Sequence, residues 1–376
     1  MNADHNAAEY ISSCRDELIR LISELCAIPA PSHGEHRRAE YCLNWLLNAG
    51  FTDAYIDSAL NVIAPLNITS DDSAVVFLAH TDTVFPDETA FVPEIKNGKL
   101  HCPAAGDDTA NVAVLLLCAR YALNFSNSRP ILFVFNSCEE GLGDLKGIKQ
   151  LMSDYSGRIS EVISLDGYIS CAYNHPVASH RYRVEVTTQG GHSYGDFGRP
   201  NAIHILSSMI ADLYTVIPPD SGKSTYNVGH ISGGTSVNSI AQSASMLFEY
   251  RSDSSEGLAS LKNAFDSLIA CYRAAGISVE TEIIGDRPGK ALSDGPGQAA
   301  LEQRFSKIYT DLFGRTPVFR SGSTDCNIPF SLGIPALCFG AVMGGGAHTY
   351  NEWIDLDSLN DGMRLALSMI LHYFEP

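Results

Sequence analysis

The sequence has few basic residues and no long hydrophobic run. It contains 25 Lys and Arg against 43 Asp and Glu, which gives a net charge of −18. A surface this acidic repels nucleic acid and anionic lipid headgroups, so we expect neither nucleic acid nor a membrane as a partner. The longest apolar stretch, residues 112–119, is too short to span a bilayer. The first ten residues lack the basic and apolar parts of a signal peptide, and we therefore expect a cytoplasmic protein.

Paired cysteines are also missing. The ten cysteines are scattered without a Cys-x-x-Cys pair, and several, such as Cys118 and Cys338, lie inside apolar runs. This usage is typical of reduced, buried thiols and argues against a disulfide framework. With 45% hydrophobic residues and neither an internal repeat nor a low-complexity segment, the composition is that of a folded globular protein.

The order of predicted strands and helices changes along the chain. A length of 376 residues favours two domains. In the first and last parts of the chain, strand patterns alternate with helical patterns, which predicts a mostly parallel sheet sandwiched by helices. The middle part has the order β-α-β-β-α-β, the ferredoxin-like pattern. We therefore expect one α/β domain, residues 1–178 and 289–376, interrupted by a smaller ferredoxin-like α+β domain, residues 179–288.

Three of the predicted strands end next to side chains that can bind metal ions. Residues 75–79, 131–135 and 162–165 are short apolar runs of the kind that form buried parallel strands. They are followed by His80 and Asp82, by Glu139 and Glu140, and by Asp166, respectively. In open α/β sheets the reactive groups gather at the carboxyl ends of the strands. Histidine and carboxylates at that edge, without a nearby phosphate-binding loop, indicate a metal site and hydrolytic chemistry.

His80 and Asp82 are two residues apart, so their side chains share a face of an extended chain. A neutral histidine can bind a divalent ion through one ring nitrogen while a carboxylate accepts a hydrogen bond from the other, which fixes the tautomer. Asp82 is a candidate for that carboxylate. An isolated His-x-Asp at a strand end is more often hydrogen-bonded to a neighbouring loop, so the pair needs support from the rest of the site.

The paired acids Glu139 and Glu140 are stronger evidence for a metal site than His80 and Asp82. Adjacent side chains diverge, so one carboxylate can bind a cation while its neighbour reaches a cation-bound water. The alternative is a solvated acidic turn, which is common in a protein this acidic. A second pair, Asp107 and Asp108, stands before a helix predicted to begin near Asn111. One of these acids can cap that helix while the other faces the sheet edge.

Asp166 and His348 complete the set of candidates. Asp166 precedes Gly167, so it is either a ligand or part of an Asp-Gly turn. His348 follows a run of glycines, residues 344–346, which lets the backbone pass close to a neighbouring group. The alternative for His348 is a flexible surface loop. Each signal alone is weak, but two histidines and several carboxylates at sheet ends are together what a two-cation hydrolytic centre requires.

These motifs resemble those of the co-catalytic zinc exopeptidases and deacylases, a family that includes aminoacylase, acetylornithine deacetylase, succinyl-diaminopimelate desuccinylase, glutamate carboxypeptidase and peptidase T. The resemblance extends from residue 28 to the final helix. It rests on residues 80–85 (HTDTVF), 106–111 (GDDTAN), 138–141 (CEEG) and 190–193 (GGHS). It implies that the inserted domain is a lid that often forms a dimer contact, and we therefore expect a homodimer.

The resemblance also implies a set of metal ligands. One zinc ion is expected at His80 and Asp166, the other at Glu140 and His348, with Asp107 bridging the two. The expected cofactor is two Zn²⁺. Mn²⁺ and Co²⁺ are alternatives, because carboxylate-rich sites accept several ions.

Further roles are implied for residues that do not bind metal. Asp82 is expected to orient the histidine ligand on its strand, and Glu139 to act as general base and acid. In the inserted domain, His192 matches a position that commonly supports the substrate carbonyl group. Asn238 and Arg251 match positions that commonly bind a substrate carboxylate or backbone.

The chain departs from the family pattern beside the expected bridging carboxylate. It has Thr109 and Asn111 where the usual pattern has Lys and Gly, and residues 102–106 lack the usual Arg. The missing lysine is not a ligand in the family, so we expect the metal site to persist. The effect of the changes on local packing and on substrate preference stays open.

The expected function is hydrolysis of an amide bond in short peptides by a zinc-bridged water. Residues 106–111 and 192–200 most resemble the peptidase T-like branch. A glutamate carboxypeptidase-like enzyme or an N-acyl-amino-acid deacylase is the alternative, which residues 82–86 (DTVFP) favour. The expected partner is thus a small peptide or an N-acyl amino acid. A non-catalytic binding protein that kept the fold would be expected to lose a ligand or the base, whereas every expected position here carries a competent residue.

Overall fold

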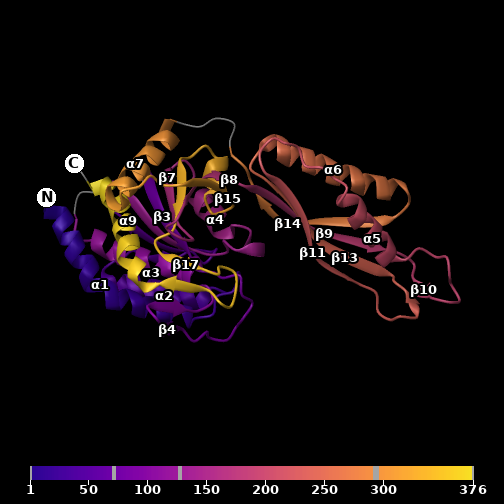
Figure 1. Cartoon of the computed structure of the whole chain (residues 1–376), viewed down its shortest axis with the longest axis horizontal. Helices are drawn as coiled ribbons and strands as arrows, with labels where there is room; N and C mark the ends of the chain where they lie inside the picture. Colours follow the sequence, from indigo (N-terminus) through magenta and orange to yellow (C-terminus); the bar gives the residue numbers. More distant parts are fainter. Residues whose placement is uncertain (1, 70–72, 126–128, 291–295, 375–376) are drawn as a thin grey trace. The chain divides into compact units, whose positions relative to one another are not determined.

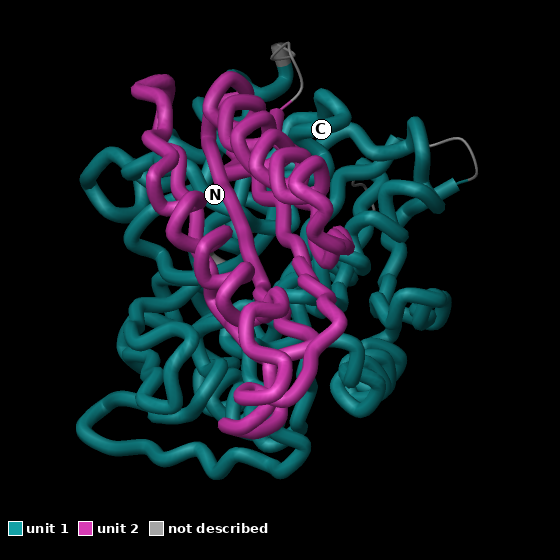
Figure 2. The backbone as a smooth tube through the Cα atoms, turned by 90° about the vertical axis from the view of Figure 1, so that its right-hand side faces the viewer, with its two compact units in different colours: residues 1–175, 291–376 teal, residues 176–290 magenta. Residues whose placement is uncertain are grey.

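The computed structural model of the chain describes residues 2–69, 73–125, 129–290 and 296–374. The chain forms two compact units (Figure 2), one made of residues 1–175 and 291–376 and the other of residues 176–290. Each unit has a hydrophobic core of its own. The second unit is thus an insertion in the chain of the first.

The first unit is built on an eight-stranded sheet with the strand order β1-β2-β6-β3-β7-β16-β8-β15. Figure 1 labels β3, β7, β8 and β15 of this sheet. Its strands are β1 (Tyr55–Ile56), β2 (Val62–Leu66), β3 (Ala74–His80), β6 (Ile131–Asn136), β7 (Ile159–Leu165), β8 (Ala172–Pro176), β15 (Phe319–Gly322) and β16 (Ala336–Phe339). The neighbours β6, β3, β7 and β16 run parallel, whereas β2 and β8 pair with this group in the antiparallel sense. The mostly parallel sheet predicted from the sequence is confirmed.

The central strands of this sheet are buried along their whole length, with apolar side chains on both faces. Every residue of β3 and of β6 is buried. Successive residues enter different cores, Phe77 on one face and Leu78 on the other. One core includes α1 (Asn2–Cys26), α2 (His36–Ala49), α3 (Ala110–Ala122), α7 (Pro296–Phe313) and α9 (Leu359–Leu371), and the other includes α4 (Lys146–Asp154) and α8 (Asn327–Ser331). Helices therefore cover both faces, as in other parallel sheets.

Helix α3 contains the longest apolar run of the sequence, and almost all of its residues are buried. Its apolar character reflects its position in the core, where it packs against α1, α9 and the sheet. Within the described part of the chain, none of the helices has both the length and the apolar character needed to cross a membrane.

A small antiparallel sheet in the first unit supports two loops. It has the order β17-β18-β5-β4, with β17 (Met343–Gly345), β18 (Trp353–Asp355), β5 (Lys99–His101) and β4 (Glu94–Lys96). β5 leads into the helical turn Ala105–Thr109, and β17 and β18 flank residues 346–352. Because β18 pairs with β5, the two loops leave the same small sheet.

The second unit is an antiparallel sheet with helices on one face. Its strands are β9 (Ala178–Thr187), β11 (Ser224–Gly233), β13 (Ser243–Ser252) and β14 (Ser278–Arg287), in the order β11-β13-β9-β14. The helices α5 (Ala202–Leu213) and α6 (Ser255–Ala274) pack on this sheet through residues such as Met209 and Phe265. A separate two-stranded ribbon joins β10 (Gly191–His192) to β12 (Ser239–Ile240). The order β9-α5-β11-β13-α6-β14 is the ferredoxin-like pattern predicted from the sequence.

Candidate metal centre

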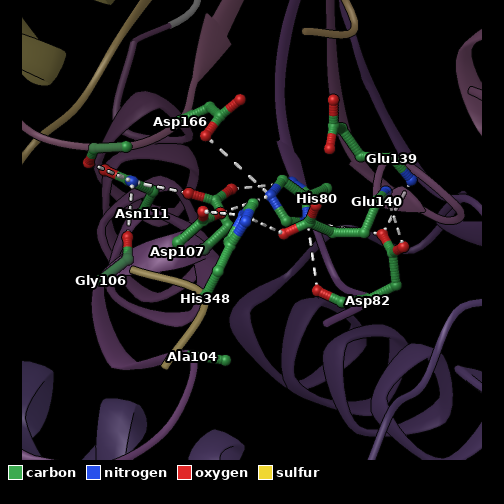
Figure 3. A network of polar contacts seen from close by, with 12 residues as sticks. His80, Asp82, Ala104, Gly106, Asp107, Asn111, Glu139, Glu140, Asp166 and His348 are labelled. Atoms are coloured by element: carbon green, nitrogen blue, oxygen red, sulfur yellow. Dashed lines mark hydrogen bonds and ion pairs between the residues drawn. The ribbon is translucent and has the colours of Figure 1, made fainter. Parts of the chain in front are cut away.

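The candidate metal ligands, together with Asp82 and Glu139, meet at the carboxyl edge of the central sheet, where β6, β3 and β7 end next to one another (Figure 3). His80 is the last residue of β3, Asp166 directly follows β7, and Glu139 lies in the turn after β6. Parallel strands end at a common edge, so neighbouring strands bring their terminal polar residues together. The turn before α3 and the loop between β17 and β18 contribute Asp107 and His348.

Asp107 lies between the two histidines. Its Oδ1 is 3.1 Å from His80 Nε2, and its Oδ2 is 3.1 Å from His348 Nε2. Asp166 Oδ1 is 4.0 Å from His80 Nε2, and Glu140 Oε1 is 3.2 Å from His348 Nε2. One oxygen of Asp107 therefore faces His80, which lies near Asp166, and the other faces His348, which lies near Glu140.

The donor set suits divalent cations. Ligand atoms lie within 4.8 Å of one another in three groups: His80 with Asp108 and Asp166, His80 with Glu139 and Glu140, and Asp107 with Glu140 and His348. Imidazole nitrogens and carboxylate oxygens are the ligands that Zn²⁺ and related ions take in proteins.

The carboxylates of this site are crowded and largely buried. Burial and the neighbouring charge of Asp107 raise the pKa of Glu140 to about 7. The same two causes raise the pKa of Asp166 well above its usual range. Burial also opposes the ionisation of Asp107, but hydrogen bonds with His348 and His80 hold its pKa below the usual range. Cations would offset the repulsion among these acids, so the residues present fit a dinuclear metal centre.

Asp82 connects His80 to the paired acids. His80 Nδ1 is 3.4 Å from Asp82 Oδ1 and 3.1 Å from the backbone oxygen of Asp82, which leaves Nε2 facing Asp107. The carboxylate of Asp82 also accepts hydrogen bonds from the backbone N–H groups of Glu139 (2.9 Å) and Glu140 (3.0 Å). Asp82 therefore holds both the imidazole and the turn of the acid pair, a second contact that sequence reasoning did not foresee.

Asp108 differs from Asp107 in its contacts. Its Oδ2 accepts a hydrogen bond from the backbone N–H of His80 (2.9 Å), and its Oδ1 accepts one from Asn111 Nδ2 (2.6 Å). The helix that follows begins at Ala110 without a side-chain cap. Neither acid is thus the helix cap that the sequence also allows, and Asp108 supports the strand end that carries His80.

Glu352 is a site residue that sequence reasoning missed. It is 1% exposed, and its Oε1 accepts hydrogen bonds from the backbone N–H groups of Gly106 and Asp107, both at 2.8 Å. Its Oε2 accepts one from the N–H of Ala104 at 2.9 Å. The carboxylate of Glu352 thus holds the turn that carries Asp107. Glu352 lies 245 residues away from Asp107 in the sequence. The one local signal that it belongs to the site is its position four residues after His348.

The remaining candidates lie in the second unit. His192, on β10, uses Nδ1 to accept hydrogen bonds from the backbone N–H groups of the turn that follows it. Asn238 directly precedes β12, and its backbone oxygen accepts a hydrogen bond from Ser193 N (3.0 Å). The structure thus brings His192 and Asn238 together. Arg251 lies on β13, where it forms an ion pair with Glu249 at 2.9 Å.

The sequence matches one family along most of its length. A sequence profile described as "Peptidase family M20/M25/M40" matches residues 76–372. This range contains every proposed metal ligand. A succinyl-diaminopimelate desuccinylase from Corynebacterium glutamicum is 24% identical over 353 residues, which cover 91% of this chain and 93% of that protein.

Solved structures of peptidases share the fold. The aminopeptidase PepT from Bacillus cereus has a TM-score of 0.70 and 21% identity, with 96% of this chain and 99% of that chain covered. A tripeptidase from Staphylococcus aureus has a TM-score of 0.76 and 21% identity, with 96% of this chain and 98% of that chain covered. At this level of identity the similarity concerns the fold.

Proposed function

The chain belongs to peptidase family M20/M25/M40, and we propose that it is a zinc-dependent exopeptidase that cleaves an amide bond of short peptides. The position of Asp107 supports this most strongly, because each of its two oxygens faces a different histidine at 3.1 Å. A carboxylate in this position can bridge two cations. We assign His80 and Asp166 to one cation, and Glu140 and His348 to the other.

Two bound cations would polarise the scissile carbonyl group and lower the pKa of a water toward about 7. Glu139 would take the proton of the attacking water and pass it to the leaving amine. A carboxylate oxygen of Glu139 lies within 4.8 Å of one of Glu140 and of a ring nitrogen of His80 (Figure 3), so one acid can bind metal while the other reaches the water bound there. Asp82 keeps both acids in place for these two roles, since its carboxylate accepts hydrogen bonds from the backbone N–H groups of Glu139 and Glu140.

The second unit is proposed to complete substrate binding. His192 would steady the developing oxyanion, and Asn238, which lies beside it, would bind the substrate backbone. Arg251 would bind a free carboxylate, although this requires it to exchange or share its partner Glu249. We propose further that the protein forms a homodimer through this unit, which sedimentation of the intact protein tests directly.

Two substrate classes, short peptides and N-acyl amino acids, each have support from the comparisons. The likeness of the fold to an aminopeptidase and a tripeptidase supports short peptides. The desuccinylase relative supports hydrolysis of an N-acyl amino acid instead. A panel of tripeptides, N-acetyl amino acids and acyl-glutamates separates these functions, because both reactions use the same cations and base but different groups around the scissile amide.

Glu139→Gln tests the mechanism. The variant should keep about two metal ions per chain and lose turnover by roughly 10²–10⁴-fold, the usual contribution of a positioned general base. Glu40→Gln, at an exposed position on α2, is the matched control and should retain full activity. Near-normal turnover of Glu139→Gln would rule out the proposed base. A protein that takes up no metal under metal-replete conditions would instead favour a binding protein that has kept the fold.

A further inference from the structure

Asn111 is a buried amide at the start of α3, and its side chain forms hydrogen bonds with segments that carry or lead to proposed metal ligands (Figure 3). Its Nδ2 donates to Asp108 Oδ1 at 2.6 Å and to the backbone oxygen of Gly167 at 3.0 Å. The backbone oxygen of Gly106 lies 3.3 Å from the same nitrogen. Its Oδ1 accepts the backbone N–H of Ala341 at 2.7 Å. Both ends of the amide are therefore satisfied within the protein.

The partners of Asn111 connect separate parts of the site. Gly106 precedes the proposed bridging ligand, and Gly167 follows the ligand at the end of β7. Asp108 accepts the backbone N–H of His80. Ala341 leads into β17, which continues to the loop of the second histidine. One side chain thus joins the turn before α3, the end of β7 and the segment after β16, and reaches the end of β3 through Asp108.

Glycine, the usual residue at this position in the resemblance noted above, could make none of these contacts. The backbone oxygen of Gly167, the N–H of Ala341 and one oxygen of Asp108 would then have to find other partners in a buried region. Buried polar groups left without a partner cost free energy, so the loops would relax. The departure from the family pattern at Asn111 therefore has a structural role in this chain.

We infer that Asn111 is a positioning residue that holds the ligand-bearing loops together and thereby sets the metal affinity of the centre. The inference rests on the proposed function, because it requires that the site binds metal. Residues that orient metal ligands commonly contribute about 10–100-fold to metal affinity. The hydrogen bonds of the Asn111 side chain end on the backbone of the loops and on Asp108, so its effect reaches the proposed ligands through these groups.

Two substitutions separate the hydrogen bonds from the volume of the side chain. Asn111→Gly removes both. Asn111→Asp keeps the shape and an acceptor for the N–H of Ala341, but it replaces the donor by an oxygen that faces Asp108 and the oxygen of Gly167. Gln298→Ala is the control: Gln298 is also a buried amide, and it bonds the backbone of Ala336 at the opposite end of β16.

The dissociation constants for Zn²⁺ are measured by competition with a chromophoric chelator, and the Co²⁺-loaded proteins are compared by absorption spectroscopy. Both Asn111 variants should bind Zn²⁺ about 10–100-fold more weakly and show an altered Co²⁺ spectrum. Gln298→Ala should lower thermal stability and leave both the Zn²⁺ affinity and the Co²⁺ spectrum unchanged.

Wild-type affinity and spectrum in a folded Asn111 variant would overturn the inference. So would variants that stay unfolded in excess metal, because Asn111 would then serve the fold as a whole. Failure of the wild-type protein to bind metal would overturn the proposed function instead.

Discussion

Replacing Glu352 by glutamine should weaken metal binding by loosening the turn that carries Asp107. The carboxylate of Glu352 accepts hydrogen bonds from the N–H groups of Ala104, Gly106 and Asp107 at 2.9, 2.8 and 2.8 Å. Glutamine can place its carbonyl oxygen at the position of Oε1 and keep the bonds from Gly106 and Asp107. Its amide nitrogen then faces the N–H of Ala104, which loses its acceptor.

The size of the effect follows from these contacts. Burial and the neighbouring charge of Asp107 raise the pKa of Glu352 to about 7, so its carboxylate is charged above that pH. One hydrogen bond to a charged group is worth about 1.5–3 kcal/mol, so in this pH range Glu352→Gln should lower the free energy of unfolding by about that amount. Glu352→Ala leaves three buried donors without partners at about 1–3 kcal/mol each, roughly 3–9 kcal/mol in total. That loss approaches the whole stability of a typical domain, about 5–15 kcal/mol. Glutamine is therefore the informative substitution, and its metal affinity should fall by about 10–100-fold.

Urea unfolding of the metal-free protein and chelator competition for Zn²⁺ measure the two effects separately. Glu161→Gln is the matched control, because Glu161 lies on β7 and binds Arg304 and the Tyr373 hydroxyl, away from the metal edge. It should lower stability without changing metal affinity. If Glu352→Gln unfolds at the wild-type urea concentration and binds Zn²⁺ with wild-type affinity, the reasoning about the turn is refuted.

Two further outcomes are expected. Gly340→Ala should destabilise the protein by about 1–3 kcal/mol or more, because the added Cβ would lie 2.1 Å from the backbone oxygen of Gly167, next to the proposed ligand Asp166. Thermal unfolding checks this against the control Gly229→Ala, whose Cβ would have no neighbour within 3.4 Å. Equal melting temperatures of the two variants would contradict the prediction. Metal affinity should fall as the pH drops below about 7, because the pKa of Glu140 is raised to about 7 and its protonated form must release a proton to bind a cation. Chelator competition from about pH 5.5 to about pH 8 should show up to about a tenfold loss per pH unit for this group on the acidic side, and a flat profile would count against Glu140 as a ligand.

Local patterns in the sequence were sufficient to predict the fold class. The apolar runs that became β3, β6 and β7 are buried on both faces, and such strands belong to parallel sheets under helices. Parallel strands end at a common edge, so the sequence alone predicts that His80 and Asp166 are neighbours. The alternation of strands and helices in the inserted unit also predicted its ferredoxin-like order, because each element there has its own periodicity.

The contacts that shape the candidate site depend on the tertiary structure alone. The N–H groups of residues 104–107 are held by Glu352, and Asn111 is joined to Ala341, which lies 230 residues away. No periodicity or fixed spacing in the sequence links the members of such a pair. They meet because β18 pairs with β5 and because α3 packs against the sheet. The sequence by itself therefore predicted a set of candidate cation ligands and placed them at the carboxyl edge of the sheet. The folded chain decided which buried groups hold Asp107 and the neighbouring loops in place, because a hydrogen bond depends on distance in space and not along the chain.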